Sequence, residues 1–447
     1  MSIISDIDNI ESKYSTDKIL YNGDILWPYI RLYMSYTMFG KGKIETNRSN
    51  IIGAIKNLFY GFFNLFRKVD YIFFTDTADR KLISGQYYDR IDFLSEKYNK
   101  KLVFELTTTK FYSRESIPTQ GITSKIPLYL LAKIIKLFVS TKSIKGIEII
   151  EQIKNDNEID INIDSLLKDY ISQYKIAKLL IKLYKPKAFI IAPSYTNMPY
   201  VHAFKKSGIK VIEFQHGIII KSHLAYNYKQ QTDKALFPDY LLSYGEFEKT
   251  IFDQNNNFIP KQNVIPIGHF YLNYIHNNYN IDSDFQEQTK SFKCKIAVSL
   301  QETFDTKMMN FINKLAATNS NIAFIIVPRT GMNIELIHDN TIIFNNLNCY
   351  ETVLNCDYHC TIYSSCAIES LGLHIQNILI NIDNKSEEHL GFLLNDKINN
   401  TLINSVDDFN LFAKDIELKE NKNSTQEYFV SNFEKNINIT FDKILNN

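Results

Sequence analysis

A histidine closes an apolar, β-prone run near the middle of the chain. Residues 211–217 read VIEFQHG, which places Gln215, His216 and Gly217 where a buried strand should end. Parallel α/β sheets present ligand-binding side chains at the carboxyl ends of their strands. The pattern therefore predicts that His216, whose imidazole exchanges protons near neutral pH, is exposed to a ligand crevice. The alternative is a histidine satisfied inside the fold.

Glu213 and His223 are weaker candidates than His216. Glu213 is a possible catalytic carboxylate, although the alternation of side chains along a strand can direct it to the opposite face. Gly217 would permit a tight turn or the close approach of a substrate.

A second candidate site lies in the stretch YHCTIYSSCAIESLGL, residues 358–373. A strand should end near Tyr363, and Ser364 or Ser365 is suited to cap the helix that follows. The free N–H groups of a helix N-terminus bind phosphate, and Glu369, on the same face as Ser365, could accept hydrogen bonds from ribose hydroxyls. The alternative is a capped helix with an ordinary surface glutamate.

Short apolar runs alternate with helical segments and would position both sites. The first set of predicted strands covers residues 70–75, 101–106, 187–192, 210–215, 240–245 and 263–268, with a helix over 165–184. The second set covers 295–301, 322–329, 341–344, 358–364, 377–382 and 400–405. Such continuous apolar runs are typical of parallel strands covered on both faces.

The order of these elements predicts an α/β fold with two Rossmann-like domains whose parallel sheets face a central cleft. A polar passage over residues 277–293 has the composition of a linker. We therefore expect a helical segment over 1–69, one domain over 70–285, and a second domain over 286–447 that ends in a closing helix.

Several motifs resemble those of bacterial surface-polysaccharide glycosyltransferases of the GT-B type. They are the QHG turn with His223 and Tyr226, FPDYLLSYGEF at 237–247, NVIPIGHFY at 263–271, and the SSxxxE pattern that ends at Glu369. Similar turns and helices occur in capsule-synthesis transferases and in CDP-glycerol-type polymerases. The resemblance covers roughly residues 187–382.

The resemblance implies an acceptor domain followed by a nucleotide-sugar-binding domain, and it assigns roles to individual residues. His216 would act as general base on an acceptor hydroxyl, or as a cation that steadies the donor phosphate, with Glu213 as a second catalytic residue. His223 and Tyr226 would bind the acceptor. The donor would be held by Gln215, Gly217, Gly268, His269, Gln301, Arg329, Ser364, Ser365 and Glu369. The sequence departs from the family at two places: FYLN replaces the usual proline–arginine after His269, and Val327 replaces a histidine.

The charge balance, the absence of several motifs and the residue spacings argue against other classes of function. With 50 basic and 49 acidic residues the net charge is +1, which gives no case for a nucleic-acid partner. The chain contains no Walker motif, GxGxxG fingerprint or GxSxG elbow. Asp-x-Asp pairs occur only in the linker and near the N-terminus, and four crowded cysteines lack zinc spacing, so we expect neither a metal nor a cofactor.

The expected location is cytoplasmic, because five cysteines do not form a disulfide framework and the N-terminus lacks a secretory pattern. Two apolar segments with basic residues, 50–68 and 126–139, are typical either of core-facing helices or of helices that lie on a membrane. A peripheral position at the inner face of the cell membrane is therefore an alternative.

The leading hypothesis is a metal-independent GT-B glycosyltransferase. It would move a sugar from a nucleotide-sugar donor to an oligosaccharide or lipid-linked acceptor of a growing capsule or lipopolysaccharide. The alternatives are a glycerol- or ribitol-phosphate transferase on the same fold, a nucleotide-sugar epimerase, and a non-catalytic assembly scaffold on the membrane. The hypothesis requires that His216 and the paired serines face each other across one cleft.

Overall fold

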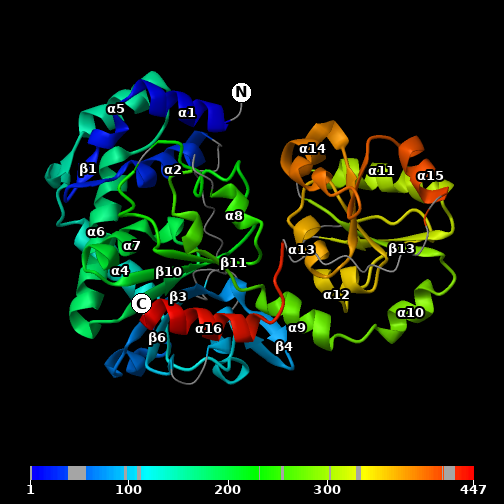
Figure 1. Cartoon of the computed structure of the whole chain (residues 1–447), viewed down its shortest axis with the longest axis horizontal. Coiled ribbons are helices and arrows are strands. Elements are labelled where there is room, and N and C mark those ends of the chain that lie inside the picture. The colour runs from blue at the N-terminus through cyan, green and yellow to red at the C-terminus, as the bar shows by residue number, and fades with distance from the viewer. Residues whose placement is uncertain are drawn as a thin grey trace. The chain divides into compact units, whose positions relative to one another are not determined.

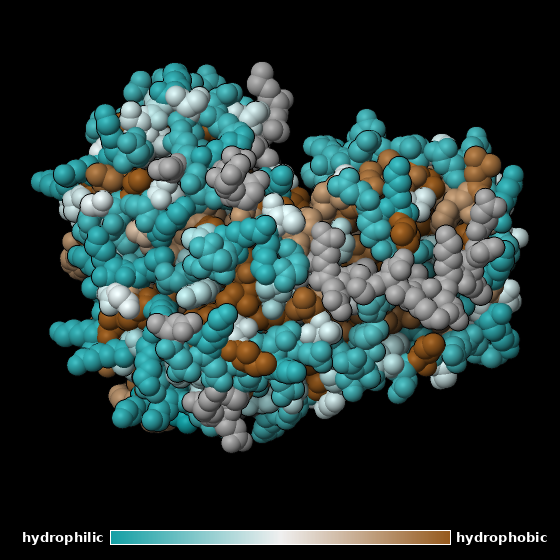
Figure 2. Space-filling view, viewed as in Figure 1, coloured by the Kyte–Doolittle hydropathy of each residue, from teal (hydrophilic) through white to brown (hydrophobic). Residues whose placement is uncertain are grey.

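The computed structural model divides the chain into two compact units (Figure 1). Unit 1 comprises Met1–Ile267 and Glu434–Asn447, and unit 2 comprises Gly268–Phe433. The structure describes residues 3–38, 57–94, 98–107, 112–230, 232–252, 256–301, 304–328, 334–414, 416 and 428–446. The face drawn in Figure 2 is largely hydrophilic, with hydrophobic residues in small groups.

A seven-stranded sheet forms the centre of unit 1. Its spatial order is β12 (Val264–Pro266), β11 (Tyr240–Ser243), β10 (Lys210–Phe214), β9 (Ala188–Ile191), β3 (Tyr71–Asp76), β6 (Lys101–Leu106) and β7 (Ile122–Ser124). All neighbouring strands are parallel. The first strand in sequence, β3, lies in the middle of the sheet, with β6 and β7 on one side of it and β9 to β12 on the other. This is the Rossmann order, and ligands bind such sheets at the switch point, here between β3 and β9.

Helices cover the sheet of unit 1 because its strands are apolar on both faces. Ile72, Phe104 and Phe189, from three adjacent strands, are all fully buried. The main helices are α4 (Ile126–Lys136), α5 (Ile147–Asp156), α6 (Ile163–Tyr184), α7 (Met198–Lys206) and the short α8 (Glu248–Ile251). The C-terminal α16 (Phe433–Asn446), red in Figure 1, returns to unit 1, where Tyr98 donates a hydrogen bond to Asp442.

The N-terminal segment is part of unit 1. It contains α1 (Ile3–Lys13), α2 (Trp27–Met38) and the strands β1 (Leu20–Tyr21) and β2 (Asp24–Ile25). In a small antiparallel sheet, β1 lies between β2 and β8 (Ile144–Lys145) and pairs with both. A hairpin of β4 (Lys81–Ile83) and β5 (Gln86–Tyr88) follows β3.

Unit 2 repeats the same strand order in a six-stranded parallel sheet. The order is β15 (Thr341–Ile342), β14 (Ile322–Val327), β13 (Cys294–Ser299), β16 (Tyr358–Thr361), β17 (Gln376–Ile380) and β18 (Asn400–Ile403). The helices are α9 (Phe270–Asn278), α10 (Ser283–Thr289), α11 (Asp305–Thr318), α12 (Cys349–Leu354), α13 (Cys366–Gly372), α14 (Lys385–Leu390) and α15 (Val406–Lys414). The switch point lies between β13 and β16.

Every strand predicted from the sequence is present, and the expected α/β class with two parallel sheets is confirmed. Two details differ. The polar passage is not an extended linker, because α10 buries Phe285 against Phe344 with ring centroids 4.7 Å apart. The closing helix was expected in the second domain, but α16 belongs to unit 1. In the part of the chain that the structure describes, no helix is long and apolar enough to cross a membrane.

Gly268 lies close to the backbone of the segment that leads into α16. Its φ of +92° lies in the left-handed region, and a Cβ atom would stand 2.3 Å from the carbonyl oxygen of Val430. The resemblance suggested that a donor phosphate approaches this glycine. The structure fills the space beside it with backbone of the same unit.

We expect Gly268→Ala to lower the midpoint of thermal unfolding more than Gly23→Ala does. Gly23 has a similar φ of +90° with no atom within 4 Å of the added Cβ, so its variant measures the backbone strain alone, about 1–2 kcal/mol. The additional loss at Gly268 reports the contact with Val430. Equal losses for the two variants would contradict this role.

Candidate functional site

The exposed side chain of His216 is paired with a buried aspartate. His216 follows β10, and Asp79 follows β3, so both lie at the carboxyl edge of the unit 1 sheet. The Nδ1 atom of His216 is 3.1 Å from Oδ1 of Asp79, with 38% of the histidine side chain exposed and 8% of the aspartate. With Nδ1 directed at a carboxylate, Nε2 is the ring nitrogen that can accept a proton from a ligand.

Arg90 fixes the other side of this pair. Its Nη2 atom is 3.4 Å from Oδ2 of Asp79, and its Nη1 atom donates a 2.5 Å hydrogen bond to the carbonyl of Gln215, the residue before His216. Burial opposes the ionisation of Asp79, but Arg90 and His216 outweigh it and hold the pKa of this carboxyl below its ordinary value. The carboxylate is therefore ionised when it meets the imidazole.

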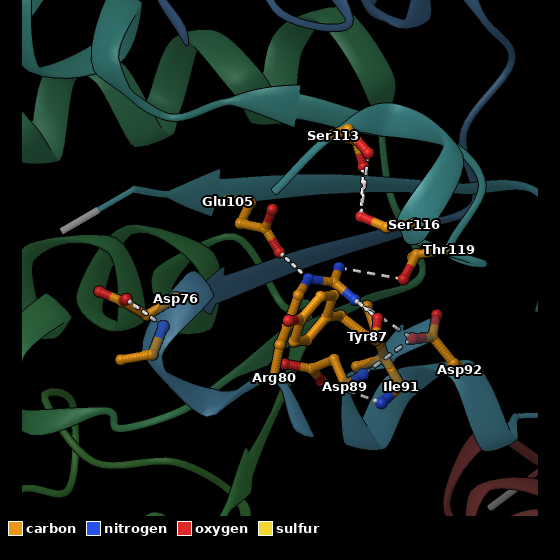
Figure 3. Close-up of polar contacts among 11 residues, drawn as sticks. Asp76, Arg80, Tyr87, Asp89, Ile91, Asp92, Glu105, Ser113, Ser116 and Thr119 are labelled. Carbon is orange, nitrogen blue, oxygen red and sulfur yellow. Dashed lines mark hydrogen bonds and ion pairs between the residues drawn. The ribbon is translucent and has the colours of Figure 1, made fainter. Parts of the chain in front are cut away.

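A buried network ties the loop between Asp79 and Arg90 to the sheet of unit 1 (Figure 3). Arg80 is its centre, and its guanidinium contacts Glu105 at 2.6 Å, the Tyr87 carbonyl at 2.9 Å, Thr119 at 3.0 Å and Asp92 at 3.4 Å. Asp89 and Asp92 form a capping box on the turn that begins with Arg90. Burial raises the pKa of Asp89 to about 6, against the pull of Arg90 and Arg80.

Glu213 and Tyr226 lie together inside unit 1, out of reach of a ligand. Glu213 is fully buried and accepts hydrogen bonds from the backbone and hydroxyl of Ser194, at 3.1 and 2.7 Å, and from the Tyr226 hydroxyl at 2.6 Å. Burial raises the pKa of Glu213. The arrangement ties the loop after β9 to the segment after His216, which is a positioning function. Both side chains are buried, so neither is exposed to contact a substrate directly.

His223 packs between aromatic rings. Its ring centroid is 4.9 Å from that of Tyr226 and 5.7 Å from that of Tyr195. Burial lowers the pKa of His223 to about 4, so the imidazole is neutral at physiological pH. A neutral, half-buried ring can contact a sugar face, but it supplies no charge to an acceptor.

Gln215 fastens the turn that carries His216. Its side chain accepts a 2.7 Å hydrogen bond from the backbone of Tyr244 and donates to Glu248 at 2.6 Å and to the Gly217 carbonyl at 2.9 Å. These contacts join the end of β10 to the end of β11. Gly217 itself is exposed, has no positive φ, and has no atom within 4 Å of an added Cβ, so the turn does not require glycine.

The switch point of unit 2 carries three of the predicted donor residues. Gln301 follows β13 and accepts a 3.1 Å hydrogen bond from the backbone of Tyr363, which follows β16. Ser364 is buried, and its hydroxyl accepts from the backbone of Cys366 at 3.3 Å. Ser365 is exposed and makes no capping hydrogen bond. The structure therefore separates the paired serines into one that shapes the turn and one that is open to a ligand.

Glu369 lies on α13, half-buried, and accepts a 3.1 Å hydrogen bond from the hydroxyl of Tyr350. The first residues of α12 and α13 also meet here, because Sγ of Cys349 is 3.6 Å from Sγ of Cys366. Since α13 has only seven residues, its terminus is a weaker source of positive potential than the sequence pattern suggested.

A neutral polar network supports this edge from within. The hydroxyl of Ser299 is 2.8 Å from Nε2 of His359, whose Nδ1 is 2.8 Å from Oδ1 of Asn377. The order resembles a serine nucleophile with its base, but Ser299 is only 4% exposed and His359 not at all. Burial lowers the pKa of His359 to about 4. The network thus stabilises the sheet without charge.

Of the two remaining predicted residues, His269 has a structural role and Arg329 lies outside the described residues. His269 is buried and caps α9, because its Nδ1 accepts a 3.2 Å hydrogen bond from the backbone of Leu272. Arg329 lies outside the described residues. Sequence reasoning missed Asp79 and Arg90. The stretch TDTADR directly after the first predicted strand was a signal for Asp79, since it puts acidic residues at the carboxyl end of that strand.

Comparison with known proteins supports the fold. No protein-family model matches the chain, and no curated protein does. The structure of Staphylococcus aureus MnaA with UDP covers 85% of this chain and 97% of its own at 11% identity and a TM-score of 0.50. Neisseria meningitidis UDP-GlcNAc 2-epimerase bound to UDP-GlcNAc (13% identity, 84% and 99% covered) and the calicheamicin glycosyltransferase CalG4 (8%, 85% and 99%) both score 0.49. At such identities the likeness concerns the fold, two Rossmann-like units of the GT-B type.

Burial raises the pKa of Glu248 to about 7, and this shift predicts a pH dependence of stability. Between the ordinary value of 4.5 and about 7 the folded chain holds a proton that the unfolded chain releases. The free energy of unfolding should therefore fall as pH rises through this window, by at most about 1.4 kcal/mol per pH unit from this group. Glu248→Gln should flatten the decline in thermal midpoint between about pH 5 and pH 8.

Glu287→Gln is the control for this experiment. Glu287 lies on α10 with 72% of its side chain exposed and is not among the groups that act on Glu248, so its replacement should leave the slope unchanged. Equal slopes in the Glu248→Gln variant and the native chain would show that Glu248 is ionised in the folded state.

Proposed function

We propose that the chain is a metal-independent glycosyltransferase that uses His216 as general base. The observation that carries the proposal is the pair of exposed His216 and buried, ionised Asp79 at the carboxyl edge of a parallel sheet. A base of this kind needs one ring nitrogen held by a carboxylate and the other accessible to a hydroxyl group. Arg90 positions both partners.

The proposed reaction is a single displacement. Nε2 of His216 takes the proton of an acceptor hydroxyl as that oxygen attacks the anomeric carbon of the donor sugar. The bond between the anomeric carbon and the phosphate oxygen breaks, and the nucleoside diphosphate leaves with the electron pair. Asp79 stabilises the imidazolium that forms, as a buried carboxylate does for a catalytic histidine. One displacement inverts the configuration of the anomeric carbon.

The nucleotide is assigned to the switch point of unit 2, where Gln301 and the exposed Ser365 follow adjacent strands. Open α/β sheets bind nucleotides at this position. The structural likeness to a protein solved with UDP favours a uridine nucleotide. The acceptor class, a growing capsule or lipopolysaccharide chain, rests on the motif resemblance.

Epimerisation of a nucleotide sugar is the second candidate, and the same His216–Asp79 pair favours it, because an accessible imidazole can also remove a proton from a sugar carbon. The two reactions differ in their need for an acceptor. Incubation with donor alone in deuterated water separates them, since an epimerase would exchange the proton on the sugar and a transferase would not.

We expect His216→Gln to lower kcat by about 10²–10⁴-fold, because it removes the base while it keeps a polar side chain of similar length. Asp79→Asn should lower kcat by at least about tenfold, since the neutral amide neither orients nor stabilises the imidazolium. The control is His276→Gln, a change at an exposed histidine of α9. Turnover is measured as release of nucleoside diphosphate. Full activity of a correctly folded His216→Gln variant would exclude the proposed role.

Nucleotide binding is tested by thermal shift with UDP, CDP, CMP, GDP and dTDP. We expect UDP to raise the unfolding midpoint, because a ligand that binds only the folded chain stabilises it. Ser365→Ala should reduce this response without lowering the midpoint of the free protein, since the hydroxyl makes no capping hydrogen bond. His216→Gln should keep the response. Loss of the response in the His216 variant but not in the Ser365 variant would contradict the assignment of the nucleotide to unit 2.

A further inference from the structure

Apolar side chains gather on three segments of unit 1 that are far apart in the sequence. More than half of the exposed large hydrophobic residues among those described lie on η2 (Phe62–Phe66) and the turn before it, on α4 with the turn after it, and on the last turns of α6. The members are Phe59, Phe62, Phe63, Phe66, Leu130, Ile134, Leu137, Phe138, Leu179 and Leu183, which we call the apolar surface.

These three segments adjoin in space. Asn64 donates a 2.6 Å hydrogen bond to the carbonyl of Ile122, the first residue of β7, and β7 leads directly into α4. The Tyr184 hydroxyl at the end of α6 donates to the carbonyl of Leu65 at 2.8 Å. Helices α4 and α6 pack side by side, with Lys136 of α4 2.6 Å from Asp169 of α6 (Figure 1).

The exposed face of α4 has the reverse of the usual pattern. Leu130, Ile134 and Leu137 follow helical spacing on the side that faces solvent, and Leu137 and Phe138 are 79% and 82% exposed. A helix of a soluble domain normally presents polar residues on this side. Phe63 on η2 is likewise apolar and is 85% exposed. Single exposed hydrophobic residues need no explanation, but a gathered set marks an interaction surface.

The charge around the apolar surface is predominantly positive. Residues 116–147 contain five lysines, of which Lys125 is buried, and residues 170–187 contain five more, and neither range contains an aspartate or glutamate. Residues 57–68 add Arg67 and Lys68, both exposed, and again no acidic residue. Among the residues that the structure describes, only Lys136 and Lys187 of these ranges pair with a carboxylate, that of Asp169 and that of Asp70, which lie just outside the ranges.

Exposed lysines stand next to exposed apolar residues on this surface, and this pattern favours a membrane over a protein as the partner. Exposed Lys133 precedes Ile134, and exposed Lys178 and Lys182 precede Leu179 and Leu183. The core of a protein–protein interface is depleted of lysine. An anionic bilayer accommodates both kinds of side chain, because apolar groups enter the acyl boundary while lysine stems reach the headgroups.

We propose that the apolar surface docks unit 1 on a membrane that contains anionic lipids. The inference is independent of the proposed catalytic function. Most of its members gather near the amino ends of the sheet: η2 precedes β3, and the last turn of α6 precedes β9. The His216–Asp79 pair lies at the opposite, carboxyl ends of the strands.

The test is co-sedimentation of the full chain with vesicles. We expect binding to phosphatidylcholine vesicles with about 30% phosphatidylglycerol, weaker binding to phosphatidylcholine alone, and release as salt rises from about 0.05 to 0.5 M. The double variant Leu137→Ser, Phe138→Ser should reduce the partition coefficient at least about tenfold. Lys133→Glu with Lys182→Glu should reduce binding to anionic vesicles only.

The matched control is Leu411→Ser with Ile439→Ser, which removes side chains that are 62% and 56% exposed outside the apolar surface and should leave binding unchanged. Because all of these side chains are largely exposed, the unfolding midpoints should stay the same. Absence of vesicle binding at low salt would overturn the proposal. It would also be overturned if the Leu137, Phe138 variant bound vesicles normally but turned a dimer into a monomer, since a second copy would then cover the surface.

Discussion

One carboxylate, that of Asp79, determines the geometry of the proposed reaction centre. Its two oxygens face different partners, His216 and Arg90, which come from separate loops at the same sheet edge. An ionised carboxylate in the interior loses several kcal/mol of hydration, and only close, well-directed cations offset that loss. Removal of Arg90 would therefore raise the pKa of this carboxyl, and the protonated form does not stabilise an imidazolium.

The two sheets share a strand order but differ in charge at their switch points. In unit 1, Asp79 and Arg90 hold fixed opposite charges beside the exposed imidazole. In unit 2, the supporting network of Ser299, His359 and Asn377 is neutral, and so is the exposed Ser365. A proton transfer needs charge that is already oriented. A nucleotide can instead be held by hydroxyl, amide and backbone groups, so the difference suits a division between a unit that moves the proton and one that holds the donor.

The sequence predicts the strands well and the site only in part, and the reason is physical. Apolar runs such as 71–76 report burial on both faces, a local property, so they locate the strands directly. The roles of Glu213 and His269 depend on contacts with Ser194, Tyr226 and Leu272, which no spacing reveals. Arg90 was missed for the same reason, since its partner Gln215 is 125 residues away. For segments 57–68 and 126–139 the spacing alone could not distinguish a core-facing helix from an exposed one, because exposure depends on tertiary packing.

The proposed membrane docking and the proposed transfer reaction, taken together, constrain the acceptor. The apolar surface gathers toward the amino ends of strands whose carboxyl ends carry His216, and β3 between them has six residues. At about 3.3 Å per residue the base would stand roughly 20 Å from the docked edge if the strands rise from the bilayer. A hydroxyl of a lipid headgroup lies within a few ångströms of the membrane and would not reach it. An acceptor several sugars long would, so this geometry favours the extension of a chain over its initiation on lipid.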